Sequence, residues 1–383
     1  MSEVVNTPRE RRRVIGRIRG ADAGPTLLCI GAMHGNEPAG VEALGRVCEQ
    51  LDADAPMLRG EFVALTGNVS ALRRDARFIH TDLNRHWIPA HVDALRNGTP
   101  PADRSVEDGE LLDLLSEIDD AIATARGDVY FIDLHTTSGD SPPFSTIGDN
   151  LRNRALALQC PASIMFGLEE QLDGTLLEFL NRRGHVTMGF EGGRHNDPRS
   201  VDYAEAFIWI ALAATGILSD PVDAPHVAKS RTLLREARGR LPRVLEVRHR
   251  HPVRIGDGFQ MRDGYSSFQR VAKGEHLAHD HDGLIHAPES GRILMPLYQP
   301  QGDDGFFVMR EFGTFWLGVS ALLRRMRADL LFRLLPGVRH DPANPMTLVI
   351  DRHIARFYAL EVFHLLGYRK RRVYDDVLVM SRR

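Results

Sequence analysis

Residues 25–51 read PTLLCIGAMHGNEPAGVEALGRVCEQL, and they predict a buried strand, a polar loop and a helix in succession. The apolar run that opens the stretch has the length and composition of a strand covered on both faces. Pro38 stands where a helix can begin, and residues 39–51 repeat apolar side chains at helical spacing. The loop between them contains His34 and Glu37, with glycines that allow it to fold back.

The same alternation continues over roughly the first 215 residues. Strand-like runs recur at 61–68, 128–135 and 185–191, and amphipathic or apolar helical patterns occur at 111–125 and 204–218. Strands that alternate with helices are typical of an α/β fold. We therefore expect a mixed, mostly parallel sheet flanked by helices.

The pattern changes twice after this region. Residues 241–315 contain short strand-like runs separated by turn signals, and they predict a small all-β domain. Residues 316–383 contain two amphipathic helical patterns and predict a helical C-terminal extension. With the α/β region assigned to residues 1–240, the 383-residue chain divides into three parts.

The bulk composition excludes several classes of protein. Net charge is −3, with 43% hydrophobic and 26% charged residues, so nothing favours binding to nucleic acid or to an acidic membrane surface. No apolar run reaches the roughly 18 residues of a spanning helix. Cys29, Cys48 and Cys160 are scattered, as expected for core thiols of a reducing compartment. We expect a cytoplasmic protein without nucleic-acid or membrane partners.

Three candidate metal ligands follow predicted strands. His34 and Glu37 come after the first strand, and His135 ends the strand at 128–135. The carboxyl ends of strands in an open α/β sheet line one crevice, so these groups can meet. Two imidazoles and a carboxylate are a ligand set of catalytic zinc, which keeps a position open. We expect one Zn²⁺ per chain, with Asp133 orienting an imidazole. Taken alone, the HxxE spacing is a weak signal and His135 fits a core histidine.

A glutamate at the end of another strand supplies a candidate for proton transfer. Glu191 follows an apolar run and precedes two glycines, which would place its carboxylate at the same crevice. A carboxylate there can act as a general base and then as a general acid. The alternative is that Glu191 caps a loop or pairs with Arg194.

The segment RFIHTDLNR at 77–85 supplies groups that suit an anionic ligand. Arg85 can grip a carboxylate through two parallel hydrogen bonds, with Asn84 beside it. Arg77 is a candidate to polarise a scissile carbonyl and hold the oxyanion. We call Asn84 and Arg85 the carboxylate clamp.

A second group of histidines lies in GEHLAHDHDG. His276, His279 and His281 could bind another metal, but a turn with exposed histidines explains them as well and is favoured.

These motifs together resemble the succinylglutamate desuccinylase/aspartoacylase family, within the zinc carboxypeptidase superfamily. The motifs that carry the resemblance are HGNE at 34–37, RxxxxDLNR at 77–85, DLHTT at 133–137 and the strand-end Glu191. The resemblance extends over about residues 25–315 and leaves the C-terminal extension outside the family pattern.

The resemblance implies a role for each site residue and a zinc-carboxypeptidase-like fold for the first domain. Zinc would bind His34, Glu37 and His135. Arg77 would contact the scissile carbonyl, and Glu191 would act as base and acid. The substrate carboxylate would bind Asn84 and Arg85, and the β domain would contribute Tyr265 to the substrate site.

We therefore expect a zinc-dependent amidohydrolase that cleaves the amide bond of a small acidic N-acyl amino acid with zinc-activated water. A zinc carboxypeptidase acting on a peptide C-terminus is the alternative enzyme, and a non-catalytic binding protein that kept the fold is the alternative from another class. The amphipathic C-terminal patterns are compatible with a homo-oligomer.

Overall fold

The protein is built around one large sheet. The computed structural model describes residues 12–54, 58–98, 104–218, 225–254, 256–342, 344–351, 360–368, 370–374 and 377–381. Eleven strands form a mixed sheet in the order β1-β3-β2-β4-β7-β5-β6-β8-β14-β13-β10. Their bounds are β1 Val14–Arg19, β2 Asp22–Gly31, β3 Arg59–Thr66, β4 Val129–Thr137, β5 Phe144–Ile147, β6 Ser163–Phe166, β7 Val186–Arg194, β8 Val244–Pro252, β10 Arg270–Val271, β13 Gly291–Leu294 and β14 Asp304–Glu311.

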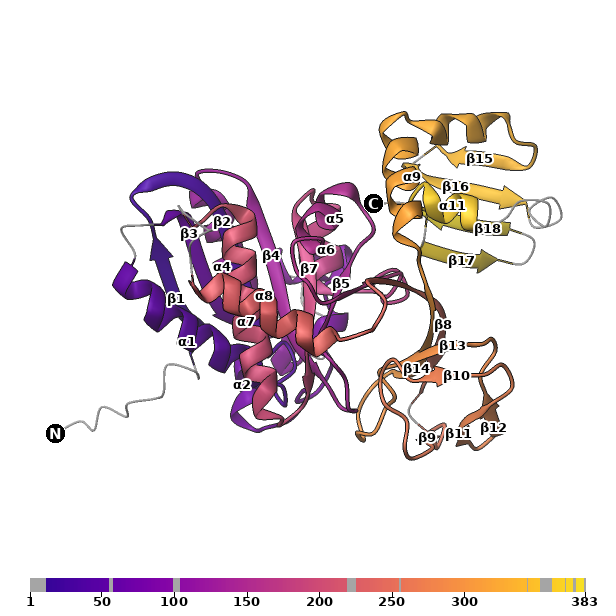
Figure 1. The fold of residues 1–383 in the computed structure, drawn as a ribbon, viewed down its shortest axis with the longest axis horizontal. Coiled ribbons are helices and arrows are strands. Elements are labelled where there is room, and N and C mark those ends of the chain that lie inside the picture. The colour runs from indigo at the N-terminus through magenta and orange to yellow at the C-terminus, as the bar shows by residue number, and fades with distance from the viewer. Residues whose placement is uncertain are drawn as a thin grey trace.

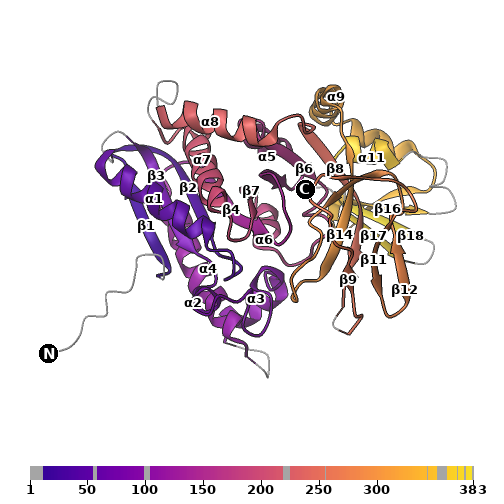
Figure 2. The ribbon, with the colours of Figure 1, turned by 60° about the horizontal axis from the view of Figure 1, so that its bottom comes forward.

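Helices cover both faces of the first part of this sheet, as the alternating sequence pattern predicts (Figures 1 and 2). They are α1 Ala39–Asp54, α2 Val69–Arg73, η3 Leu83–Arg85, α3 Pro89–Arg96, α4 Val106–Thr124, α5 Leu151–Ala157, α6 Leu176–Arg182, α7 Pro198–Thr215 and α8 Pro225–Arg238. Side chains of α1 and α7 form one apolar core with the sheet, and side chains of α4 and α6 form the other. The strands between two such cores read as continuous apolar runs for this reason.

The strands that carry the candidate site are parallel neighbours. β2 pairs in parallel with β3 and β4, and β4 pairs in parallel with β7. β1 and β5 are antiparallel to their partners β3 and β7, which makes the sheet mixed. The carboxyl ends of β2, β4 and β7 therefore lie side by side, as the sequence predicts.

The region 241–315 is all-β, but most of it continues the large sheet. β8 pairs in parallel with β6, and β14, β13 and β10 follow outward from it. A separate three-stranded sheet contains β9 Gln260–Met261, β11 His276–Asp280 and β12 Gly283–His286. We call residues 244–311 the β module. Its sheet is continuous with that of the α/β domain, which places its loops beside the carboxyl ends of the central strands.

The C-terminal part is not all helical, so that expectation is wrong. α9 Thr314–Arg325 confirms the first helical pattern, and η4 Ala328–Leu334 follows it. A four-stranded antiparallel sheet then appears, with α11 Leu360–Leu365 packed near it (Figure 1). The strands of that sheet are β15 Val338–Asp341, β16 Asn344–Asp351, β17 Lys370–Tyr374 and β18 Val377–Ser381.

Alternate residues of β16 and β18 are buried, and this pattern explains why the structure has strands where the sequence analysis expected helices. Leu348 and Ile350 are fully buried, and Leu378 and Met380 are buried opposite them on β18. Alternation of this kind indicates strands, but over four or five residues it is easily masked by neighbouring helical patterns. The second helical pattern covers residues 351–367; residues 352–359 lie outside the described residues, and the described remainder contains α11. None of the described helices has the length and apolar character needed to cross a membrane.

Candidate active site

His34 and Glu37 lie in a tight turn directly after β2. The backbone N–H of Glu37 donates to the carbonyl of His34 at 3.1 Å, and Nδ1 of His34 lies 2.9 Å from Oε1 of Glu37. The turn packs closely on α2, because a Cβ added at Gly35 would lie 2.1 Å from the carbonyl carbon of Ala71. A glycine at this position is therefore part of what places the two side chains together.

His135 reaches the same point from β4. Its Nδ1 lies 3.1 Å from Oε2 of Glu37, so the Glu37 carboxylate bridges two imidazoles. Its Nε2 lies 2.8 Å from Oδ2 of Asp133, which is the orienting contact that the sequence predicts. The backbone N–H of Thr136 donates to Oε2 of Glu37 at 2.9 Å and fixes the carboxylate further.

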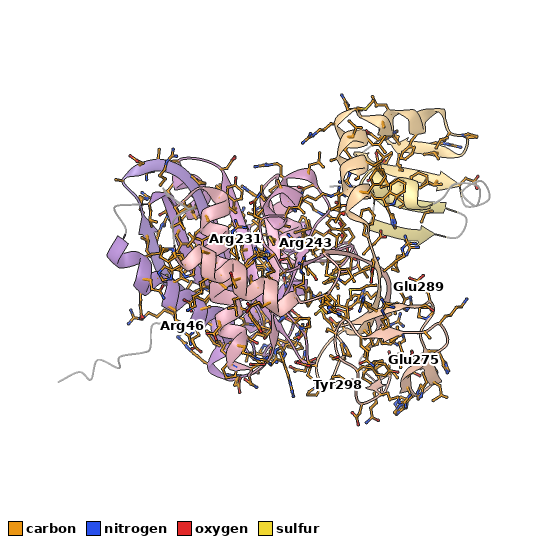
Figure 3. The ribbon with its side chains drawn as sticks, viewed as in Figure 1. Arg46, Arg231, Arg243, Glu275, Glu289 and Tyr298 are labelled. Atoms are coloured by element: carbon orange, nitrogen blue, oxygen red, sulfur yellow. The ribbon has the colours of Figure 1, made fainter. Side chains whose placement is uncertain are left out.

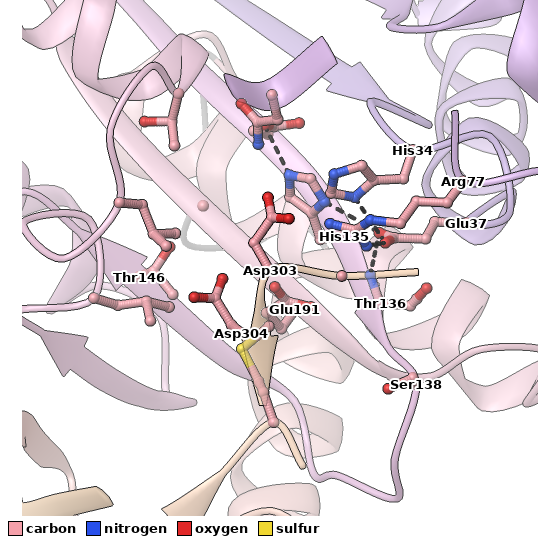
Figure 4. Close-up of a pocket in the computed structure, with 18 of the residues that line it drawn as sticks. His34, Glu37, Arg77, His135, Thr136, Ser138, Thr146, Glu191, Asp303 and Asp304 are labelled. Atoms are coloured by element: carbon pink, nitrogen blue, oxygen red, sulfur yellow. Dashed lines mark hydrogen bonds and ion pairs between the residues drawn. The ribbon is translucent and has the colours of Figure 1, made fainter. Parts of the chain in front are cut away.

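The three side chains fit a single metal ion. Their ligand atoms all lie within 4.8 Å of one another, and Figure 4 shows them converging. Burial alone would raise the pKa of the Glu37 carboxyl, but His34 and His135 hold that pKa well below its usual range. Two imidazoles with an ionised carboxylate suit zinc and leave a position open. We call His34, Glu37 and His135 the metal group.

Asp82 connects the metal group to the neighbouring arginine and to the clamp. Its Oδ1 lies 3.1 Å from Nε2 of His34 and also accepts the backbone N–H of Asn84 at 2.9 Å. Its Oδ2 accepts from Nη2 of Arg77 at 3.0 Å. Burial alone would raise the pKa of Asp82, but His34 and Arg77 hold it well below its usual range. The sequence analysis missed Asp82, although its place as the N-cap of the DLNR turn was a usable signal.

Arg77 lies against the metal group with its guanidinium largely buried. Besides its hydrogen bond to Asp82, its Nη1 lies 3.7 Å from Oε1 of Glu37. Arg77 also lines the cavity that contains the metal group. A fixed cation at this place can donate to negative charge that develops on a ligand beside the metal.

Glu191 lies on β7 directly opposite His135 of β4 in the register of the sheet. Its side chain is buried and lines the same cavity, and its Oε2 has no hydrogen-bond partner among the described residues. Burial raises the pKa of Glu191 to about 8; nearby His135 opposes this rise, while Glu37 and Asp133 add to it. A carboxylate held in this way is suited to accept and return a proton.

The clamp residues also line the cavity, but both already have partners. Oδ1 of Asn84 accepts the backbone N–H of Leu176 at 3.0 Å, so the NH₂ end of the amide is the end left for a ligand. Nη2 of Arg85 donates to Oδ2 of Asp304 at 3.2 Å, and its Nε lies 3.8 Å from Asp303. Asp303 and Asp304 come from the β module, and the sequence analysis did not single them out.

Part of the chain is similar in sequence to known proteins. Residues 23–171 match the family model described as the succinylglutamate desuccinylase/aspartoacylase catalytic domain. A succinylglutamate desuccinylase from Burkholderia cenocepacia is 30% identical over 116 residues, which are 30% of this chain and 32% of that protein. One from Pseudomonas fluorescens is 34% identical over 86 residues, 22% of this chain and 25% of that protein. The matched region thus spans about a third or less of these curated relatives.

Solved structures extend the likeness in fold beyond this region. A succinylglutamate desuccinylase/aspartoacylase structure from Rhodobacter sphaeroides has a TM-score of 0.55 at 20% identity, covering 77% of this chain and 88% of that one. The succinylglutamate desuccinylase from Vibrio cholerae also has a TM-score of 0.55, at 18% identity, covering 76% and 82%. Residues 23–171 of this chain are thus similar to the catalytic domain of the succinylglutamate desuccinylase/aspartoacylase family, and the larger part of the chain shares its fold with the solved structures.

The structure does not bring Tyr265 to the cavity. Its side chain packs in the core of the β module, where its hydroxyl donates to Glu275 at 2.7 Å. Figure 3 labels Glu275 on the side of the β module away from the α/β domain and Tyr298 on the side nearer to it. The residues of the β module that do line the cavity are Met295, Leu297, Gln299, Gly302, Asp303, Asp304 and Phe307.

His195 is a further cavity residue that the sequence analysis missed. Its Nδ1 hydrogen-bonds with the hydroxyl of Thr136 at 2.7 Å, so it is tied to the residue that follows His135. Burial lowers the pKa of His195, which favours the neutral ring. The signal in the sequence was its position four residues after the strand-end Glu191.

The positions of two other groups of histidines can be explained without a metal ion. His86, His91 and Asp108 gather their ligand atoms, but Asp108 already accepts from the ring of His91 at 2.8 Å and from the backbone N–H of Ser105. The second of these contacts belongs to the capping box of α4. His276, His279 and His281 do not form a metal-like group within the described part of the chain.

Proposed function

We propose that this chain is a zinc-dependent amidohydrolase that removes the acyl group from an N-acyl amino acid. The observation that supports this most directly is that Glu191 lies beside the metal group in one cavity with Arg77 and the clamp. A metal-dependent amide hydrolase needs a metal, a base, an oxyanion partner and a substrate anchor, and this cavity contains a candidate for each.

The metal group would hold the zinc, which when bound polarises the acyl carbonyl and makes water more acidic. Asn84 and Arg85 hold the carboxylate of the amino acid and so set the position of the amide. Glu191 takes a proton from the attacking water. Arg77 donates to the carbonyl oxygen as negative charge develops on it. Glu191 then delivers the proton to the departing amine nitrogen, so one carboxylate serves both proton transfers.

A carboxypeptidase would use the same groups but would need room for a peptide. The β module supplies Leu297, Gln299 and Gly302 to the lining of this cavity, so a second part of the chain walls the site on that side. A pocket walled in this way favours a small substrate over a peptide that extends in both directions. We therefore prefer the deacylase hypothesis to the carboxypeptidase hypothesis.

Elemental analysis and a hydrolysis panel test the proposal. Purified protein should contain zinc and release free amino acid from at least one member of an N-acetyl and N-succinyl amino-acid panel. A chelator should abolish the release, and added zinc should restore it. Cleavage of peptides with no release from the N-acyl panel would favour the carboxypeptidase, and retention of zinc without any hydrolysis would favour a binding protein.

A further inference from the structure

Two adjacent carboxylates form an acidic wall beside the clamp. Asp303 and Asp304 both line the cavity, and Figure 4 draws them with Glu191 and the metal group. Asp304 bridges two arginines, because one of its oxygens accepts from Arg85 and the other from Nε of Arg250. Asp303 lies 3.8 Å from Nε of Arg85, and its side chain is 56% exposed. A ligand can therefore reach the Asp303 carboxylate from the cavity.

The charges around the clamp balance only while no substrate is bound. Arg85 and Arg250 offset Asp303 and Asp304. A substrate carboxylate that binds Arg85 adds one negative charge next to Asp303. Like charges at this spacing disfavour one another, and a partly exposed site screens them only in part.

No other arginine or lysine of the described cavity lining is left to offset this charge. Arg77 is the only other arginine there, no lysine occurs in that lining, and the Arg77 guanidinium already faces Asp82 and Glu37. A substrate with a second carboxylate near the clamp would lie against Asp303 without a cation of its own. A substrate with a positive group at that place would restore neutrality.

We propose that the preferred substrate is an N-acyl amino acid with a cationic side chain, whose ammonium group lies against Asp303 while its α-carboxylate binds Asn84 and Arg85. Asp303 is the residue that would determine this specificity. The positive charge belongs to the amino-acid part and not to the acyl part, because Asp303 lies next to the arginine that holds the carboxylate. The inference rests on the proposed deacylase function and narrows its substrate class.

The test compares three Nα-acyl amino acids that differ in the charge of the side chain: the lysine, norleucine and glutamate derivatives. Each is supplied with an acetyl and with a succinyl group, and kcat and KM are measured on the zinc-loaded protein. We expect kcat/KM to fall in the order lysine, norleucine, glutamate. The lysine derivative should exceed norleucine by up to roughly fivefold, the range of a partly exposed ion pair, and the difference should lie mainly in KM.

Variants assign the preference to Asp303. Asp303→Asn should bring the ratio of kcat/KM for the lysine derivative to that for the norleucine derivative down to about one, whatever its effect on the two values themselves. Asp303→Lys should make the glutamate derivative better than the lysine derivative. Asp282→Asn removes the same charge from an exposed turn of the β module outside the cavity lining, and it should leave the order as in the wild type.

The outcomes separate this inference from the function on which it rests. If none of the compounds is hydrolysed, the deacylase proposal fails and the inference fails with it. If hydrolysis occurs but the glutamate or norleucine derivative is preferred, the cationic assignment is overturned and the deacylase proposal stands. An unchanged lysine preference in Asp303→Asn would also overturn the role of Asp303.

Discussion

His135 and Glu191 are register partners on the adjacent parallel strands β4 and β7. Partners in a parallel pair point to the same side of the sheet, so a candidate metal ligand and a candidate base emerge together at one edge of the cavity. The rigid sheet, and not a loop, sets the distance between them. This arrangement makes the role of Glu191 separable from metal binding by mutation.

We predict that Glu191→Gln retains zinc but loses most of its turnover. The amide keeps the shape of the side chain and cannot accept a proton, and general acid–base catalysis typically contributes ~10²–10⁴-fold. Zinc content is measured by elemental analysis and kcat on the best N-acyl amino acid. Glu236→Gln, on the exposed surface of α8, is the matched control and should keep wild-type values of both. A Glu191→Gln variant with near-wild-type kcat would remove Glu191 from the mechanism.

The same substitution should stabilise the metal-free protein at high pH. The folded-state pKa of Glu191 is raised to about 8 by burial, above its ordinary value of 4.5. Its contribution to stability is therefore fully present below about pH 4.5 and is lost as the pH rises through about 8. Glutamine does not ionise, so the variant does not lose this stability as the pH rises. Each unit by which the folded-state pKa exceeds the unfolded-state pKa corresponds to about 1.4 kcal/mol.

Thermal unfolding with chelator present checks this second prediction. The Tm of Glu191→Gln minus that of the wild type should be clearly more positive at pH 8.5 than at pH 5.5. Comparing the two proteins at each pH cancels the titration of the groups they share. A difference in Tm that stays constant, or that falls as pH rises, would contradict the raised pKa.

Much of the site could be predicted from the sequence because its groups stand at strand ends. His34, His135 and Glu191 each follow an apolar run, and the topology of a parallel sheet brings such positions together without knowledge of side-chain detail. Asp82 could also have been predicted from the sequence, because it begins the DLNR turn. The positions of these residues could be predicted because one local pattern indicated both the strand and the residue that follows its end.

The rest of the site depends on contacts that no local pattern contains. Asp304 meets Arg85 across 219 positions of the chain, and it does so because β8 joins the large sheet beside β6 and brings β14 with it. The short strands after residue 337 were missed for a related reason: their burial pattern arises only when they pair with one another. Tyr265 was expected at the site only from the family resemblance, and in this chain its hydroxyl donates to Glu275 in the β module instead.

Asp133 and Asp82 should be distinguishable although each holds one imidazole of the metal group. Asp133 contacts His135, so Asp133→Asn should weaken zinc binding by ~10–100-fold, with little change in KM once zinc is saturating. Asp82 also binds Arg77 and the backbone of Asn84, so Asp82→Asn should weaken zinc and also raise KM. Competition with a chromophoric chelator gives the zinc affinity, and kinetics at saturating zinc give KM. Equal effects of the two variants on KM would contradict the connecting role assigned to Asp82.

Zinc stoichiometry tests whether the metal group is the one site in the described part of the chain. The Nδ1 atoms of His34 and His135 face the Glu37 carboxylate between them, whereas the carboxylate of Asp108 is held by His91 and by the cap of α4 at Ser105. We therefore expect about one zinc per chain in the wild type. His135→Ala should reduce this to nearly none, because two remaining ligands hold zinc weakly. His91→Ala should keep the full amount. Loss of zinc from His91→Ala, or its retention in His135→Ala, would place the ion at the other group and would detach Glu191 from the chemistry proposed for it.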